Sequence, residues 1–338
     1  MNSTVKNFKT IIIESRLFSV IAIVIVILMR YLMFNQLGVI EYKSTNANYL
    51  WDVIAPLFTD PWTSFILSSV CVFIIAIILS QLNVKYGLIR GRSNLPLVIP
   101  LILFSLHPIS LSISPDLLAT IFILWAMVPL TDSYQNSRPQ KYSFQASVLI
   151  SIAGVFQIYA LMFIPLWWIG QRMMNGLTAK SFFSTLLGAF LVYIFVFSLF
   201  VFGDNIGGFL LPFYCYDNID FGSYWFFTVP QWGFIVLLLV LIISHIVIDF
   251  KHFFRDKVLS QKFITFSVVL IIFSIILQIT YIGQSLLWLF IIISLLSLVI
   301  SHYYSTTTDK WGVYFYFIML VLLTSYFFIK CYTDLSPF

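Results

Sequence analysis

Charged side chains are the scarcest feature of this chain: Asp, Glu, Lys and Arg make up 9% of its 338 residues, against roughly 25% in ordinary soluble domains. Hydrophobic residues make up 61%. A soluble fold of this length could not cover so much apolar surface, whereas a lipid bilayer can. The 36 Phe, 18 Tyr and 9 Trp also suit a lipid-facing protein with interfacial aromatic side chains. The composition therefore predicts an all-α, polytopic integral membrane protein.

Cysteine, histidine and nucleotide-binding motifs are also sparse. The three cysteines, Cys71, Cys215 and Cys331, are far apart and have no metal-type spacing. The four histidines are scattered, and the sequence has no P-loop, dinucleotide-binding glycine fingerprint or His-Glu-x-x-His segment. The net charge of +5 does not indicate nucleic acid, because the basic residues lie in short loops between apolar runs. Such loops indicate membrane topology.

Eight apolar runs are long enough to cross a membrane, for which about 20 residues per helix are needed. Two further regions do not fit this length: residues 95–108 are short and contain prolines, and residues 144–170 are too long for one span. The eight clear runs are residues 17–35, 63–82, 114–131, 183–203, 232–250, 263–281, 285–303 and 312–330.

The basic residues orient the chain, because cytoplasmic loops carry the excess of Lys and Arg. If residues 144–170 formed a single span, Arg172 and Lys180 would lie outside. If these residues instead form a tight helical hairpin that turns near Tyr159, both lie in the cytoplasm, and the external basic residues are only Arg30, Lys43 and Lys330. This predicts about eleven membrane segments, including short broken hairpins, in a bacterial inner membrane. The N-terminus is expected in the cytoplasm and the C-terminus outside. The external acidic residues would be Glu41, Asp52, Asp60, Asp116, Asp204, Asp217, Asp220 and Asp334.

Asp52 and Asp116 are the candidate catalytic residues. Residues 48–58 mix aromatic and aliphatic side chains with Asp52, which suits a helix lying in the membrane interface. The alternative for Asp52 is the solvated face of that helix. Asp116 follows Ser114 and Pro115 at a helix start, so it either complements the helix dipole or is a carboxylate at the mouth of a cavity. We expect Asp52 and Asp116 to approach one another across a cavity open to the external face.

Asp60, His107, Arg30 and Glu41 are the candidate substrate-binding residues. Asp60 precedes Pro61 and also fits the cap of the next helix. His107 opens the external turn that leads to Asp116. Arg30 lies near the outer end of the first span, where its long side chain could snorkel to the interface or pair with an acid.

The order of these features resembles the membrane glycosyltransferases of the GT-C class. A first span is followed by an external loop with a carboxylate and an interfacial helix, a second span, a basic cytoplasmic loop, and short segments with another external Asp. The resemblance covers roughly residues 15–204 and implies a polyprenyl-phosphate-linked sugar as donor. It also implies that an acidic residue of the first external loop acts as a base or binds a divalent metal.

A second resemblance concerns the segment 81–89, then Arg92 and Leu95–Pro96, and the segment 114–118. They are similar to an uncharacterised family of bacterial inner-membrane proteins, catalogued as a domain of unknown function, over about residues 10–205. This resemblance implies a location and a fold class, and no activity. Two regions are expected: residues 1–204 as a GT-C-like membrane module with an interfacial external loop at 36–62, and residues 205–338 as an external loop followed by four membrane helices.

Three functions remain open on the sequence. A glycosyltransferase needs a carboxylate for the acceptor's proton and a cation for the leaving phosphate, and external cations are so scarce that a divalent metal would have to help. A lipid or glycan transporter would use broken helices, although few ionisable residues fall at mid-membrane depth. A non-enzymatic partner in a cell-envelope assembly is the third. Membrane lipids are expected partners in each case, nucleic acid in none, and the oligomeric state is open.

Overall fold

The computed structural model describes residues 3–38, 48–89, 92–217, 229–252, 256–281 and 284–333, and every regular element within them is a helix. Eight of these helices are long and apolar enough to cross a membrane, which confirms the eight predicted spans and the helical membrane class. They are α2 (Arg16–Leu37), α4 (Pro61–Tyr86), α6 (Pro115–Asp132), α9 (Ala179–Phe202), α11 (Val229–His252), α12 (Val258–Thr280), α13 (Leu287–Thr306) and α14 (Lys310–Thr333).

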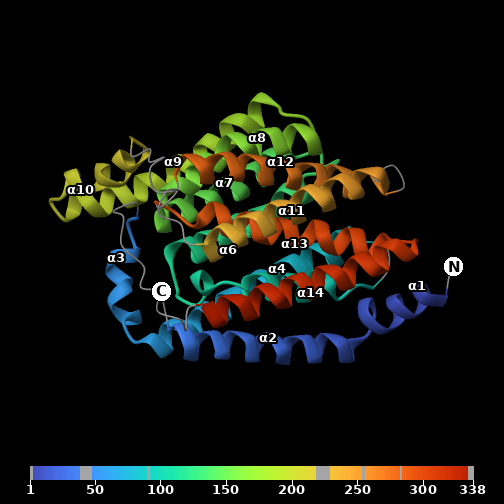
Figure 1. Cartoon of the computed structure of the whole chain (residues 1–338). Coiled ribbons are helices and arrows are strands. Elements are labelled where there is room, and N and C mark those ends of the chain that lie inside the picture. Colours follow the sequence, from blue (N-terminus) through green and yellow to red (C-terminus); the bar gives the residue numbers. More distant parts are fainter. Residues whose placement is uncertain are drawn as a thin grey trace.

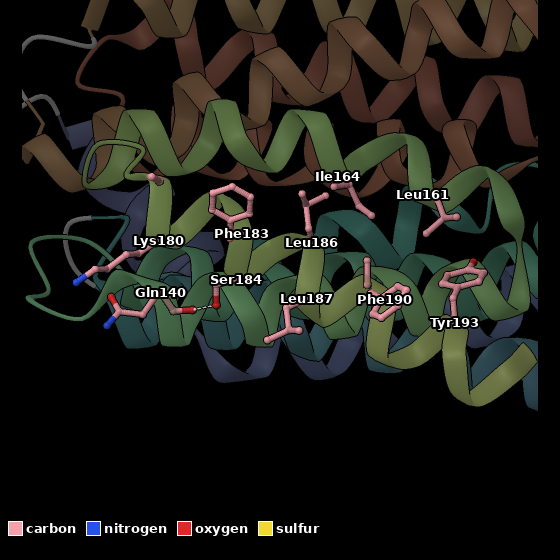
Figure 2. A pocket seen from close by; sticks show the side chains of 12 residues that line it. Gln140, Leu161, Ile164, Lys180, Phe183, Ser184, Leu186, Leu187, Phe190 and Tyr193 are labelled. Atoms are coloured by element: carbon pink, nitrogen blue, oxygen red, sulfur yellow. Dashed lines mark hydrogen bonds between the residues drawn. The ribbon is translucent and has the colours of Figure 1, made fainter. Parts of the chain in front are cut away.

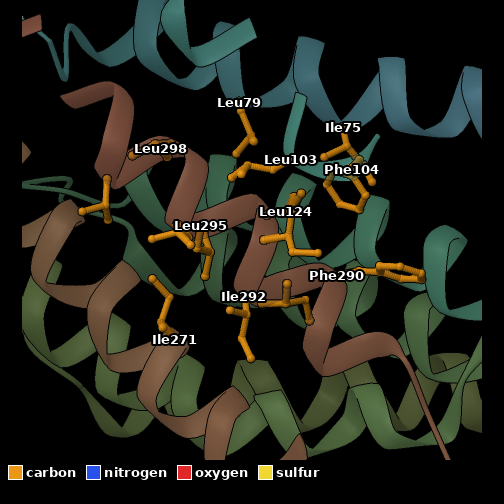
Figure 3. Packing of buried hydrophobic residues seen from close by; sticks show 14 of the residues in the cluster. Ile75, Leu79, Leu103, Phe104, Leu124, Ile271, Phe290, Ile292, Leu295 and Leu298 are labelled. Carbon is orange, nitrogen blue, oxygen red and sulfur yellow. The ribbon is translucent and has the colours of Figure 1, made fainter. Parts of the chain in front are cut away.

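The long helices run alongside one another in a single bundle (Figure 1). α13 is its central helix, because almost all its side chains are buried. Its Phe290 packs against Phe104 with ring centroids 5.8 Å apart, within a cluster of aliphatic side chains from α4, α6 and α12 (Figure 3). α2 and α9 lie at the periphery and expose many aliphatic and aromatic side chains. An apolar exterior of this kind is stable in lipid and not in water.

Local signals fix where the helices begin and end. Asp60 caps α4 by accepting a hydrogen bond from the Thr63 amide at 2.9 Å, with Pro61 in the first helical position. α4 ends at Gly87, which adopts the left-handed conformation at φ 57° that glycine tolerates best. Ser114 caps α6 in the same way as Asp60, with Leu117 as donor.

The two ends of the bundle differ in the elements they carry. We call one end the basic end, where α1 (Ser3–Phe8), the π-helical η1 (Lys9–Ile13) and the start of α5 (Leu95–Phe104) lie. There Asn94 donates to the Ile13 carbonyl at 2.9 Å. The opposite end, which we call the acidic end, carries α3 (Trp51–Ile54), α10 (Ile206–Leu210) and η5 (Leu211–Asp217) (Figure 1).

The predicted hairpin at 144–170 is present. α7 (Pro139–Phe156) leads into the 3₁₀ turn η4 (Ile158–Met162), which contains Tyr159, and the chain returns as α8 (Phe163–Met174). At the basic end the two feet of the hairpin meet, because Asn175 donates to the Asn136 carbonyl at 2.7 Å. The turn near Tyr159 is therefore confirmed.

α5 (Leu95–Phe104) is short, as the prolines of residues 95–108 predicted. Ten residues of helix span about 15 Å, half of the roughly 30 Å hydrocarbon core. The chain continues as a loop, residues 105–114, that includes the 3₁₀ turn η3 (Pro108–Ser110) and is buried almost throughout. Non-helical backbone is tolerated at membrane depth when it is enclosed by protein.

The stretch 48–58 is helical and is not a span. α3 (Trp51–Ile54) and the 3₁₀ turn η2 (Ala55–Phe58) run across the acidic end, at a steep angle to the long helices (Figure 1). This is the orientation expected of an interfacial helix. Glu41, from the preceding part of the loop, lies outside the described residues.

Candidate functional site

Asp116 occupies the second position of α6 and is completely buried. Its Oδ1 atom accepts hydrogen bonds from the Gln157 side-chain amide and from the Ser285 hydroxyl, both at 2.7 Å. Gln157 ends α7 and Ser285 precedes α13, so one carboxylate oxygen joins three helix ends. The amides of Leu286 and Leu287 at the start of α13 face the same carboxylate. Partial positive charge at two helix starts offsets part of the cost of burying a carboxylate here.

On the side of the acidic end, the Asp116 cluster (Asp116, Gln157 and Ser285) is covered by η4 and η5, which two tyrosines hold together. Tyr159 donates to the Cys215 carbonyl at 2.9 Å, while Tyr216 donates to the Ile158 carbonyl at 2.6 Å. These reciprocal bonds hold η5 on η4. Burial raises the pKa of Tyr216, so its phenol remains a hydrogen-bond donor at neutral pH.

The expectation that Asp116 lines an open external cavity opposite Asp52 is therefore wrong. Asp116 has no exposed surface, whereas Asp52 is exposed on α3. The physical reason is that residues 105–114 are folded into the bundle and draw the start of α6 in with them. Of the two sequence interpretations of Asp116, complementing helix ends describes what the structure contains.

Arg30 is also buried, with 3% of its surface exposed. Its Nε atom donates to the Ser69 hydroxyl at 3.0 Å, and one Nη atom donates to the Ser68 hydroxyl at 3.1 Å and to the Ser110 carbonyl at 2.9 Å. The other Nη atom donates to the Ser110 hydroxyl at 3.4 Å. Arg30 therefore connects α2 to α4 and to η3. We call Arg30, Ser68, Ser69 and Ser110 the Arg30 cluster.

The hydrogen-bond partners of Arg30 among the described residues are all neutral oxygen atoms, and its guanidinium carbon lies 6.0 Å from the centroid of the Phe65 ring. No carboxylate within the described part of the chain forms an ion pair with the guanidinium, and the side chain neither snorkels to water nor pairs with an acid there. Arg30 lies seven residues before the end of α2 at Leu37, or about 10 Å along the axis. Keeping a charge at that depth without a counter-charge costs several kcal/mol (order of magnitude).

His107 belongs to the same loop as Ser110. Its Nδ1 atom accepts from the Ile109 amide at 3.3 Å, and its ring lies 4.9 Å from the ring of Phe234 on α11. The Ser110 hydroxyl also contacts the His107 carbonyl at 3.3 Å. His107 is thus brought next to the Arg30 cluster through the backbone of η3, with its ring turned toward α11.

α3 packs over the same region. Trp51 forms a small apolar cluster with Cys71 of α4 and Ile113, the residue before the α6 cap. Cys71 is also an electrostatic neighbour of Arg30. The structure thus places the helix that carries Asp52 above the loop that holds the Arg30 cluster, while the Asp116 carboxylate is directed toward α7 and α13. Asp60 is exposed and serves as the α4 cap.

Sequence reasoning missed the residues that complete both clusters. Gln157, Ser285, Ser68, Ser69 and Ser110 are polar residues within or beside apolar runs, and that was the only signal available. Among the residues that the structure describes, we find no group of three or more His, Cys, Asp or Glu side chains that could hold a metal ion.

No known protein-family model, curated protein or solved structure matches this chain.

Proposed function

We propose that the acidic end of this protein binds the phosphate group of a lipid-linked substrate through Arg30. The observation that supports this most is the guanidinium itself, which is buried in the apolar bundle and, within the described chain, is hydrogen-bonded only to neutral oxygens. Intramembrane charges are costly and generally mark substrate paths. Arginine presents a planar set of donors that matches a phosphate, and serine hydroxyls can exchange places with phosphate oxygens.

The proposal assigns the acidic end to the outside of a bacterial inner membrane. The eight long helices, α5 and the two arms of the hairpin then make eleven segments, with the N-terminus in the cytoplasm and the C-terminus outside. The position of the basic residues supports this orientation. Lys262 reaches the Met174 carbonyl at 3.4 Å, so the foot of the hairpin and α12 share one basic surface.

The reaction class proposed is inverting transfer of a sugar from a polyprenyl phosphate, as in the GT-C enzymes. The acceptor hydroxyl oxygen forms a bond to the anomeric carbon, its proton passes to the Asp52 carboxylate, and the bond from that carbon to the phosphate oxygen breaks. The phosphate leaves with the bonding electron pair. Arg30 is the cation suited to stabilise the charge that develops on it. Asp116 is given no part in this proton transfer, because its carboxylate is directed toward Gln157 of α7 and Ser285 before α13.

Lipid movement is the second candidate, and the shortness of α5 favours it. A half-length helix followed by an enclosed loop is the broken-helix arrangement found at transporter binding sites. Binding of a lipid phosphate at Arg30 is common to both candidates, while the proton acceptor Asp52 is required only by the transferase. A non-enzymatic envelope partner would require neither.

The binding step is tested with purified protein in nanodiscs of zwitterionic lipid that contain trace radiolabelled polyprenyl phosphate. Arg30→Gln removes one charge-assisted contact worth about 1.5–3 kcal/mol, which corresponds to binding about 10- to 150-fold weaker. The matched control is Arg92→Gln, an exposed arginine at the basic end, which should bind as wild type. Arg30→Gln with wild-type affinity would overturn the proposal. If Arg30→Gln does not fold, Arg30→Lys replaces it. This variant keeps the charge but loses the planar set of donors, so the lipid should bind more weakly than to wild type. Wild-type affinity in folded Arg30→Lys protein would overturn the proposal.

The chemical step is tested separately with a polyprenyl-phosphate-linked labelled sugar. Asp52→Asn should abolish transfer and leave lipid binding and membrane insertion intact, whereas Asp60→Asn, the matched change at the α4 cap, should retain transfer. Transfer at the wild-type rate by Asp52→Asn would show that Asp52 is not the base. Wild-type protein that binds the lipid and transfers no sugar would favour lipid movement.

A further inference from the structure

A long groove runs along the outer side of the bundle between α8 and α9. Its volume is about 1030 Å³. Gln140 and Lys180 lie at one end and Leu161 and Tyr193 at the other, with Phe183, Leu186, Leu187, Phe190 and Ile164 between them (Figure 2). The groove is apolar along its length and has its charged residue at the end that coincides with the basic end of the bundle.

The groove follows from how α9 packs. α9 lies tightly on α7, since a side chain on Gly188 would come within 2.9 Å of the Phe144 carbonyl oxygen, and the Ser147 hydroxyl donates to the Thr185 carbonyl. α8 has only 12 residues and does not run the full length of α9. A trough is left beside them. At its far end Tyr193 and Leu161 meet over Gly154, where any Cβ would collide with the Tyr193 hydroxyl.

The mouth of the groove is positively charged. Lys180 is exposed and lies in the first turn of α9, while Lys141 and Arg172 are exposed at the nearby ends of α7 and α8. The ends of α7 and α9 are held together, because Ser184 donates to the Gln140 carbonyl at 2.8 Å. Basic clusters beside membrane-spanning helices attract anionic headgroups.

We propose that this groove binds an anionic phospholipid from the leaflet at the basic end, with its phosphate at Lys180 and one acyl chain along α9 toward Tyr193. From Lys180 to Tyr193 the helix rises about 20 Å, somewhat more than the roughly 15 Å of one leaflet's hydrocarbon. The groove therefore suits an extended chain whose headgroup stays at the interface. The charge at the mouth selects an anionic headgroup over a zwitterionic one.

This site is distinct from the Arg30 cluster, which lies at the opposite end of the bundle. Its ligand is a bilayer lipid, and its occupancy requires no chemistry at Arg30 or Asp52. The groove proposal and the Arg30 proposal are therefore independent, and a negative result for one does not contradict the other.

The test uses full-length protein with a photoreactive phenylalanine analogue at Phe183, in nanodiscs of either dioleoyl phosphatidylglycerol or dioleoyl phosphatidylcholine. Crosslinked lipid is measured by mass spectrometry of the intact protein. Capture should favour phosphatidylglycerol. Lys180→Gln should reduce that preference about fivefold, the fold-change that corresponds to about 1 kcal/mol per basic residue near an anionic surface.

A second variant tests the groove rather than the charge. Leu187→Trp fills the groove and should suppress capture of both lipids, whereas Leu191→Trp, an equally exposed site on α9 outside the groove, should not. Lys310→Gln is the matched charge control, because Lys310 is exposed at the start of α14. Equal capture of the two lipids by wild-type protein, an unchanged preference in Lys180→Gln, or capture by Leu187→Trp equal to that by Leu191→Trp would each overturn the proposal.

Discussion

Replacing Asp116 tests whether this carboxylate stabilises the bundle, as its position indicates. In Asp116→Ala the Ser285 hydroxyl would lose its acceptor, and the Gln157 amide would keep only its longer bond to the Ser285 hydroxyl oxygen at 3.3 Å, while both remain buried. A buried donor left without a partner costs about 1–3 kcal/mol. One unpaired donor and one lost bond of the Gln157 amide together predict a loss of about 1.5–4.5 kcal/mol in the free energy of unfolding.

Asp116→Asn separates hydrogen bonding from charge. The asparagine oxygen can accept from the same two donors, so the loss should be well below that of Asp116→Ala. The measurement is equilibrium unfolding in mixed micelles, followed by tryptophan fluorescence. Ser198→Ala, at an exposed serine that bonds only within α9, is the control and should change little.

A double-mutant cycle with Ser285→Ala makes the test specific. Residues that share a hydrogen bond show coupling energies of about 0.5–3 kcal/mol, and independent sites show additive effects. Additive losses for Asp116→Ala and Ser285→Ala, or an Asp116→Ala protein as stable as wild type, would refute the reasoning. Asp116→Asn protein that folds and yet fails to bind polyprenyl phosphate would return Asp116 to the functional site.

Two further predictions concern topology and packing. In a cysteine-free background, a cysteine placed at Asp52 should react with an impermeant maleimide from outside, and cysteines at Asn175 and Lys257 should react only after permeabilisation; labelling at 175 from outside would contradict the assigned orientation of the hairpin. Gly188→Leu should destabilise the protein by about 1–3 kcal/mol, because the added Cβ alone would come within 2.9 Å of a backbone oxygen of α7, whereas Gly207→Leu, with open space around it, should leave the melting temperature unchanged.

The fold was largely predictable because its main determinants are local. Runs of apolar residues must match the thickness of a bilayer, and caps such as Asp60 with Pro61, or Ser114 with Pro115, mark where helices start. The hairpin at Tyr159 was also predictable, although from charge rather than hydropathy, because a single span would have put Arg172 outside. The eleven-segment count and the orientation depend on the same charge argument, and labelling is the measurement that decides them.

The site was less predictable because its side chains come from distant parts of the chain. The partners of Asp116 are 41 and 169 residues away from it, and the serines that surround Arg30 are 38 to 80 residues away. No periodicity or motif links such positions. Asp52 and Asp116 are both acidic, and both were predicted on the external side of the membrane, which suggested that they lie close together. In the structure Asp116 is buried and Asp52 is exposed, which does not support that expectation.

By itself the sequence determined the membrane class, the long spans, the short segment before residue 105 and the break at Tyr159, since each depends on a run of residues compared with a fixed length or on a local cap. Only the tertiary structure decided that residues 105–114 fold inward, that Asp116 is enclosed while Asp52 is exposed, and that Arg30 donates to serines. The physical reason is that burial depends on which helices pack side by side. In a bundle whose surface and core are both apolar, hydropathy does not reveal which face of a helix is turned inward.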